Sequence, residues 1–477
     1  MEAPHRGGML PREMDVDAAR YTSSSSFDPE IFEATVYVNA AHIKALDKLG
    51  IIDKRATAAA LSVLKSILSE RPTIPETAED IHIFIESLVS KSVASVGEML
   101  ALGKSRNDAV VAAVKIEVKR RLYRLVEKIL EAVEVVLNRS LSEKDTIFPV
   151  YTHLQRAAPA TFGFVLQSYA VRLLRCVSAL MNCLDACEEC PLGSAAVAGT
   201  SIPLDREFVA ESLGFKKISV NALEATASRD FLIQLLSALL QTAVVLSCFA
   251  EEMVLYSSEE FGLLLMPAEH SATSSIMPQK RNPVVAEIMR TKAAELLGQL
   301  ISVSVILSRQ PSGYNLDLQQ TTPKVWKAFE EISESVALMA RLAETVQVNR
   351  QKALQACGPP AAAVEIANML TMEKRLSFRR AHKIAAKISR LFVMRQLDEE
   401  SCRRVFEEEC VDPVSLETLM SLMDPANAVY RYSVDGSAHP EKVAEASRRL
   451  LAEARDLKAS VIIKGREFVE ILQRLLL

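Results

Sequence analysis

The feature that most constrains this fold is a stretch of nearly forty residues, 107–144, whose apolar residues recur at helical spacing. Glycine is scarce along the whole chain, with 15 among 477 residues, or about 3% against a usual ~7%. Long runs of Ala, Leu, Val, Glu, Lys and Arg take the place of turn-rich alternation. The sequence therefore predicts an all-α protein built on long helices.

Length and charge narrow the class of protein. A chain of 477 residues predicts two or three domains, and its texture changes after about residue 356, where shorter helices and prolines begin. The net charge of −4, without a Lys/Arg cluster interleaved with aromatics, gives no support for a nucleic-acid partner. Residues 1–26 are polar and lack an apolar core of signal-peptide length, so we expect a cytoplasmic protein.

The most apolar segment, Phe231–Ala250, approaches membrane-spanning length. It contains Gln234 and Gln241 and is bracketed by the charged pairs 229–230 and 251–252. We therefore expect a helix buried among other helices, and no membrane partner.

The eight cysteines do not suggest disulfides in a long chain of this kind. Cys183, Cys187 and Cys190 have the C-x3-C-x2-C spacing that can ligate an iron–sulfur cluster. The same positions share one face of a helix, where small packing residues explain the pattern. Nothing else resembles a metal site or a phosphate-binding loop, so we expect no metal and no cofactor.

The stretch Ser271–Pro283 carries most of the chemical information. It reads Ser-Ala-Thr-Ser-Ser-Ile-Met-Pro-Gln-Lys-Arg-Asn-Pro, and apolar residues at helical spacing follow it. Asn282 suits an N-cap and Pro283 suits the first helical position. An ordinary helix-initiating loop would explain these residues. The loop would also deliver a hydroxyl, an ammonium and an amide to a helix N-terminus, where an oxyanion is stabilised.

The string from Ser274 to Pro283 resembles the signature of the fumarase/aspartase superfamily, whose members expel a group β to a carboxylate and release fumarate. Gln279 resembles the argininosuccinate lyase version of this signature. Further segments resemble that family in the right order across roughly residues 24 to 390: Glu79–Glu86, Gly103–Asp108, Tyr151–Pro159, Pro191–Thr200, Asn221–Asp230, Gly313–Gln319 and Ser377–His382. The chain therefore resembles the argininosuccinate lyases, and its motif sequences are most similar to those of archaeal members.

This resemblance implies an architecture and an activity. It implies a three-domain fumarase/aspartase-like fold, with an N-terminal helical domain (1–106), a central long-helix bundle (107–355) and a C-terminal helical domain (356–477). It implies a homotetramer in which each active site borrows loops from three subunits. The implied reaction cleaves argininosuccinate to arginine and fumarate, by proton abstraction and β-elimination, in arginine biosynthesis.

The resemblance also assigns roles to residues. Ser274 matches the catalytic base, and Lys280 stabilises the doubly charged aci-carboxylate. His153 resembles the partner histidine that Glu287 orients; whether it acts as general acid or polarises a carboxylate stays open. Arg106 and Asn107 would bind carboxylate and amino-acid groups. The substrate-binding set is Ser24, His82, Ser105, Arg106, Asn107, Thr152, Asn282, Tyr314 and Gln319.

Some positions depart from the family pattern. Ala101-Leu102 stands where the family commonly has His-Thr, and Ala158 where it usually has Gln. Thr273 replaces a glycine of the mobile loop, which predicts slower or different loop closure. Thr322 replaces a lysine, and Lys324 lies close enough in sequence to substitute for it.

Two other functions are consistent with a helical chain of this kind. Another superfamily lyase, such as an adenylosuccinate lyase, would not be expected to carry Gln279 or the segment 314–319. A non-catalytic, crystallin-like structural protein would be expected to have lost catalytic residues, yet Ser274, His153, Lys280 and Glu287 are all present.

Overall fold

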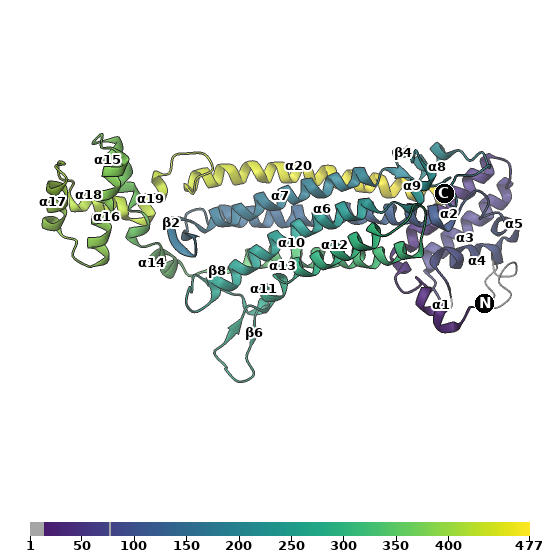
Figure 1. Ribbon diagram of the computed structural model, residues 1–477, viewed down its shortest axis with the longest axis horizontal. Coiled ribbons are helices and arrows are strands. Elements are labelled where there is room, and N and C mark those ends of the chain that lie inside the picture. Colours follow the sequence, from purple (N-terminus) through teal and green to yellow (C-terminus); the bar gives the residue numbers. More distant parts are fainter. Residues whose placement is uncertain (1–13, 76–77) are drawn as a thin grey trace.

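The computed structural model describes residues 14–75 and 78–477, and it is predominantly helical. Figure 1 shows an elongated molecule: a bundle of long helices runs along its length, with shorter helices gathered at each end. The long helices are α6 (Arg106–Ser142), α7 (Phe162–Ala186), α10 (Asp230–Ser257), α12 (Lys292–Ser308), α13 (Thr322–Thr345) and α20 (Pro440–Gln473). The predicted all-α fold with a central long-helix bundle is confirmed.

Helix α6 is the axis of the bundle. Ser105 caps its N-terminus through a capping box with Asp108, and no glycine or proline interrupts its 37 residues, which span about 55 Å. Its buried residues pack against α7, α13 and α20. The prediction of one long helix over 107–144 is therefore correct to within two residues at each end.

Helix α10 contains the apolar segment Phe231–Ala250 and packs against α7, α12 and α13, as a buried central helix should. By length and composition, three helical segments could cross a membrane: α7, α10, and Val284–Ser308, which comprises α11 (Val284–Met289) and α12. Packing inside the bundle accounts for the apolar faces of α7 and α10. The segment Val284–Ser308 differs because most of it is not buried in the single chain.

Helix α20 is the last α-helix of the chain and runs unbroken from Pro440 to Gln473. No proline follows its first position, and its only glycine, Gly465, faces Tyr123 of α6 so closely that a Cβ would lie 3.2 Å from the Tyr123 Cβ. Lys119 of α6 places its ammonium 4.5 Å from the centre of the Phe468 ring. The helix therefore stays continuous while it runs back along the bundle (Figure 1).

Short helices cover the two ends of the bundle. Those at the N-terminal end are α1 (Val16–Thr22), η1 (Asp28–Ile31), α2 (Phe32–Lys48), α3 (Lys54–Glu70), α4 (Ile81–Ser92), α5 (Ala94–Gly97), α8 (Arg206–Ser212), α9 (Ala222–Ala227), η3 (Leu316–Thr321) and η4 (Arg474–Leu476). Those towards the other end are η2 (Ala268–His270), α14 (Arg350–Ala361), α15 (Val364–Met372), α16 (Phe378–Val393), α17 (Glu399–Glu408), α18 (Leu416–Met423) and α19 (Pro425–Arg431). Helices α15–α18 enclose an apolar core separate from that of the bundle. The domain boundaries at 106 and 355 stay a prediction.

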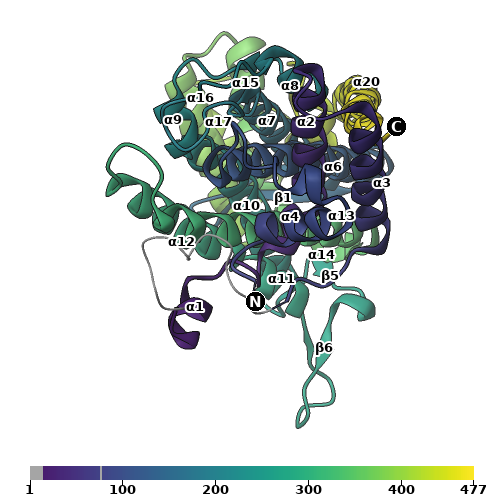
Figure 2. The ribbon, with the colours of Figure 1, turned by 90° about the vertical axis from the view of Figure 1, so that its right-hand side faces the viewer.

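Within the described ranges, the strands form four two-stranded ladders. The antiparallel pairs are β1 (Ile147–Thr152) with β2 (Gln155–Thr161), β5 (Leu264–Leu265) with β8 (Gln347–Val348), and β6 (Ala272–Thr273) with β7 (Arg281–Asn282). The parallel pair is β3 (Glu189–Cys190) with β4 (Lys217–Ile218). The β6–β7 hairpin projects from the body of the molecule in both views (Figures 1 and 2).

The cysteine triplet does not share a helix face, because α7 ends at Ala186, before Cys187 and Cys190. All three cysteines are buried in the main apolar core. Burial raises the pKa of the Cys187 and Cys190 thiols to about 12 and that of Cys183 to about 11. The thiols therefore remain protonated and behave as small packing groups.

Candidate active site

A cavity that is partly open to solvent lies beside the N-terminal end of α6. Its lining residues are Ser24, Phe27, Asp28, Ile31, Asp80, His82, Arg106, Val110, Val114, Arg229, Tyr314, Leu318, Gln319, Thr322 and Trp326. It therefore gathers segments that lie far apart in the sequence. Five predicted substrate-binding residues line it together: Ser24, His82, Arg106, Tyr314 and Gln319.

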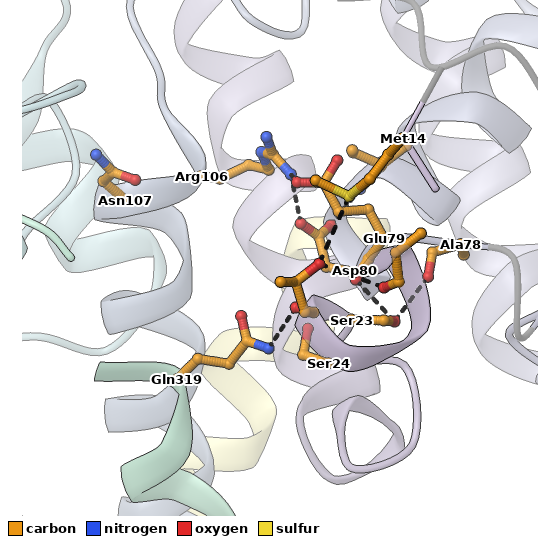
Figure 3. A network of polar contacts seen from close by, with 12 residues as sticks. Met14, Ser23, Ser24, Ala78, Glu79, Asp80, Arg106, Asn107 and Gln319 are labelled. Atoms are coloured by element: carbon orange, nitrogen blue, oxygen red, sulfur yellow. Dashed lines mark hydrogen bonds and ion pairs between the residues drawn. The ribbon is translucent and has the colours of Figure 1, made fainter. Parts of the chain in front are cut away.

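Arg106 occupies the first position of α6 and is paired with carboxylates at the cavity wall. Its Nη1 lies 2.8 Å from Glu79 Oε1 and 2.7 Å from Asp80 Oδ2 (Figure 3). Burial opposes the charge of Arg106, but Asp80 and Glu79 outweigh it and raise the pKa of the guanidinium. Asp80 also caps α4 by accepting from the Ile83 amide at 2.8 Å. The α4 and α6 N-termini are thus joined by one ion-pair network.

Ser24 and Asp28 present hydrogen-bond acceptors on the same cavity. Ser24 Oγ donates to Asp28 Oδ2 at 2.8 Å, and the Ile81 amide donates to the same oxygen at 2.8 Å. Because the Ser24 hydroxyl already donates its hydrogen to Asp28, its oxygen can act towards a ligand only as an acceptor. Burial of Asp28 raises the pKa of its carboxyl from 3.8 to about 7.

His82 is buried in the cavity wall. Its Nε2 has no hydrogen-bond partner among the described residues, so it is available to a ligand. Burial lowers the pKa of the imidazole, and the Lys104 ammonium lowers it further against the opposing carboxylates of Asp80 and Glu86. Lys104 is held 2.8 Å from Glu86 and also donates to Asn39. This buried pair fixes the α4–α6 junction from behind.

Ser274 lies elsewhere, at the start of the loop that joins β6 to β7. Its Oγ accepts from two backbone amides, Ile276 N at 3.2 Å and Met277 N at 3.1 Å. Lys280 on the same loop is exposed. The amide donors favour negative charge on the Ser274 oxygen, which is the state that a serine base requires. Sequence reasoning missed these two amides because they are backbone groups.

The predicted cap at Asn282 is wrong. Asn282 pairs with Ala272 in the β6–β7 ladder, so its backbone is committed to an extended strand. Helix α11 begins at Val284 with Pro283 as its cap residue, without a side-chain cap. Lys280 and Asn282 therefore belong to the β6–β7 hairpin that directly precedes α11. Glu287 lies in the first turn of α11.

His153 occupies a hairpin turn. Strands β1 and β2 are joined by His153 and Leu154, whose φ angles are 56° and 55°. Two consecutive left-handed residues match a type I′ turn, in which glycine or asparagine is usual. His153 and Thr152 are exposed at this tip.

The predicted residues therefore divide into separate places in one chain. The cavity lies among η1, α4, α6, η3 and α13, whereas the β6 hairpin and the β1–β2 hairpin lie farther along the bundle (Figure 1). Asn107 turns away from the cavity and donates from Nδ2 to Ala196 O at 2.9 Å (Figure 3). Ser105 uses its hydroxyl to cap α6. Thr152 and Asn282 lie on the two hairpins beside the predicted catalytic residues, whereas the five binding residues that line the cavity do not meet the hairpins within this chain.

The cavity also contains residues that sequence reasoning did not assign to it, namely Asp28, Asp80 and Arg229. For Asp28, the only signal in the sequence was its position four residues after Ser24. Thr322 lines the cavity, but Lys324 does not; it donates to Gln320 O in its own helical turn at 3.0 Å. Lys324 therefore does not reach this cavity within the chain.

Asp28 makes the stability of the protein depend on pH. Its pKa is about 7 in the folded protein and 3.8 in the unfolded chain. Its contribution to the free energy of unfolding is therefore most favourable below pH 4 and is lost as the pH rises through 7. Asp28→Asn keeps an acceptor for Ser24 and Ile81 but cannot ionise. As the pH rises from about 4 to about 8, the free energy of unfolding of the variant, measured with urea, should increase relative to that of wild type by on the order of 4 kcal/mol. A stability difference that stays constant with pH would contradict this assignment.

Comparisons with known proteins agree with these observations. Residues 10–298 match the protein family described as Lyase. The argininosuccinate lyase of Methanothermobacter thermautotrophicus is 34% identical over 92% of this chain and 96% of its own length. The argininosuccinate lyase of Pelotomaculum thermopropionicum is 33% identical over 94% of this chain and 98% of its own length.

Solved structures show the same fold. An EDDS lyase variant with bound fumarate superimposes with a TM-score of 0.82 at 22% identity, covering 96% of this chain and 95% of its own. A class II fumarase from Schistosoma mansoni superimposes with a TM-score of 0.67 at 17% identity, covering 86% of this chain and 95% of its own. The sequence relatives, the matching family and the fold agree, and the chain belongs to the argininosuccinate lyase family of the fumarase/aspartase superfamily.

Proposed function

We propose that this protein is a carbon–nitrogen lyase of the cytoplasm that cleaves argininosuccinate to arginine and fumarate in arginine biosynthesis. The observation that carries this proposal is the cavity beside α6. It places Ser24, His82, Arg106, Tyr314 and Gln319 around one space, and each matches a substrate-binding position of the family by its motif. Relatives named argininosuccinate lyase, 31–34% identical over more than nine-tenths of this chain, support the same substrate.

The chemistry follows from the hairpin residues. Ser274 removes the proton next to the carboxylate, since the amides of Ile276 and Met277 stabilise its oxyanion. Lys280 supplies positive charge to the aci-carboxylate that forms, and this preorganised charge lowers the barrier without rearrangement. The electron pair then expels the guanidinium nitrogen, and His153, oriented by Glu287, assists its protonation or polarises a carboxylate.

The separation of the cavity residues from Ser274 and His153 supports active sites shared between subunits, as a homotetramer would supply them. Helix α12 offers a surface for assembly. Leu297, Ile301 and Val305 recur every four residues on one face and are 46%, 54% and 47% exposed in the single chain. A row of half-exposed aliphatic residues on an outer helix is typical of an interface that a second copy covers.

Fumarate release from argininosuccinate, followed by ultraviolet absorbance, tests the proposed function. We expect turnover with argininosuccinate and none with adenylosuccinate. Turnover of adenylosuccinate alone would assign the chain to a sister lyase. A folded tetramer that turns over neither would favour the crystallin-like structural function.

A further inference from the structure

Arg229 is the most deeply buried guanidinium on the cavity wall. Its side chain is 3% exposed, and it lies between α9 and α10, where sequence reasoning read it only as the polar end of an apolar helix. Nη1 donates to two backbone carbonyls, Thr226 O at 3.3 Å and Ser228 O at 2.8 Å. Nε has no partner in the part of the chain that the structure describes.

The charge of Arg229 also lacks a counter-ion. Within residues 14–75 and 78–477, no carboxylate forms a salt bridge with it. Burial accordingly lowers the pKa of its guanidinium to about 10, so the side chain still carries its charge at neutral pH. An unpaired buried cation is costly unless an anion joins it. The cavity that it lines is the place from which an anion can arrive.

Arg106 differs from Arg229 in this respect. Motif resemblance favours Arg106 as a carboxylate binder, but its guanidinium already contacts Glu79 at 2.8 Å and Asp80 at 2.7 Å. A third carboxylate would compete with both of them. Arg229 has its charge and at least one N–H donor free.

The neighbours of Arg229 fit an amino-acid end group. Tyr314 lines the same cavity and offers a hydroxyl donor, whereas the Thr322 hydroxyl already donates to Gln319 O at 3.1 Å. Thr322 stands where many members of the family have a lysine, so this wall lacks a second cation. Across the cavity, Asp28 and Ser24 offer acceptors that suit an ammonium.

We propose that Arg229 binds the α-carboxylate of the arginine part of the substrate, and that it supplies the positive charge that Thr322 cannot. This inference rests on the proposed function. Arg229 then determines specificity: it distinguishes an α-amino acid from the same guanidinium compound without its carboxylate. It takes no part in the proton transfers, which occur at the succinate end.

Arginine and agmatine, which lacks the carboxylate, are the probes for this inference. Calorimetric binding to intact wild type should favour arginine by about 100-fold, because a buried cation is left unpaired by agmatine. Arg229→Gln should weaken arginine binding by about 100-fold and change agmatine binding by less than about 3-fold. Arg229→Lys, which keeps the buried charge, should restore part of the preference. Arg403→Gln, on exposed α17, is the matched control and should change neither.

Several outcomes would overturn the inference. Equal affinities of wild type for arginine and agmatine would do so, as would equal weakening of both by Arg229→Gln in a folded protein, which indicates a structural role. If Arg229→Gln does not fold by circular dichroism, Arg229→Lys decides, and equal weakening of both ligands refutes the inference. An arginine preference lost in Arg106→Gln but kept in Arg229→Gln would assign the carboxylate to Arg106. Wild type that releases no fumarate from argininosuccinate would instead refute the proposed function.

Discussion

Ser274→Ala is expected to lower kcat for fumarate release by about 10³-fold or more, because it removes the group that takes the substrate proton. The Ser274 oxygen accepts from the amides of Ile276 and Met277, and a methyl group cannot use those donors. The change should leave KM nearly unaltered, since the binding cavity lies on other elements. Steady-state kinetics with argininosuccinate measures both constants.

Ser275→Ala is the matched control for this variant. Ser275 carries the same hydroxyl on the same loop, is exposed, and should tolerate the change with less than about a 5-fold loss. If Ser275→Ala abolished turnover and Ser274→Ala did not, the base would be Ser275. If both variants kept full turnover, proton removal would not depend on this loop.

The helices of this fold could be predicted because their signals are local. Helix α6 has its cap, its apolar period and its uninterrupted length within one stretch of sequence. The hairpins could not be predicted in the same way. The β1–β2 turn is made by His153 and Leu154 in left-handed conformations, without the glycine or asparagine that usually marks such a turn. Asn282 has the features of a cap, but its pairing with Ala272 overrides that preference.

The site was predictable only where a motif identified it. Ser24, Arg106 and Gln319 were found by resemblance, and the structure brings them to one cavity. Arg229 and Asp28 were not found, because their importance depends on burial and on the absence or presence of partners contributed by distant segments. A sequence shows that a residue is charged, but it does not show whether a counter-ion lies beside it.

Mixing two inactive variants is expected to restore activity, because Arg106 at the cavity and Ser274 on the β6–β7 hairpin lie apart in one chain. Arg106→Gln should leave Glu79 and Asp80 without their cation and inactivate the cavity of its own subunit. Ser274→Ala should inactivate the hairpin of its own subunit. In tetramers that mix the two variants equally, about one quarter of the sites should combine an intact Arg106 with an intact Ser274 from another subunit.

Co-expression with two different affinity tags yields the mixed tetramers, and fumarate release should approach about one quarter of the wild-type rate. The matched control mixes Ser274→Ala with the double variant Ser274→Ala/Arg106→Gln. That mixture contains no intact Ser274 and should stay inactive. If mixed tetramers recovered no activity, Arg106 and Ser274 would have to act within one subunit, and the β6–β7 hairpin would have to fold back onto its own cavity. The projecting hairpin in Figure 2 favours reach toward a neighbour.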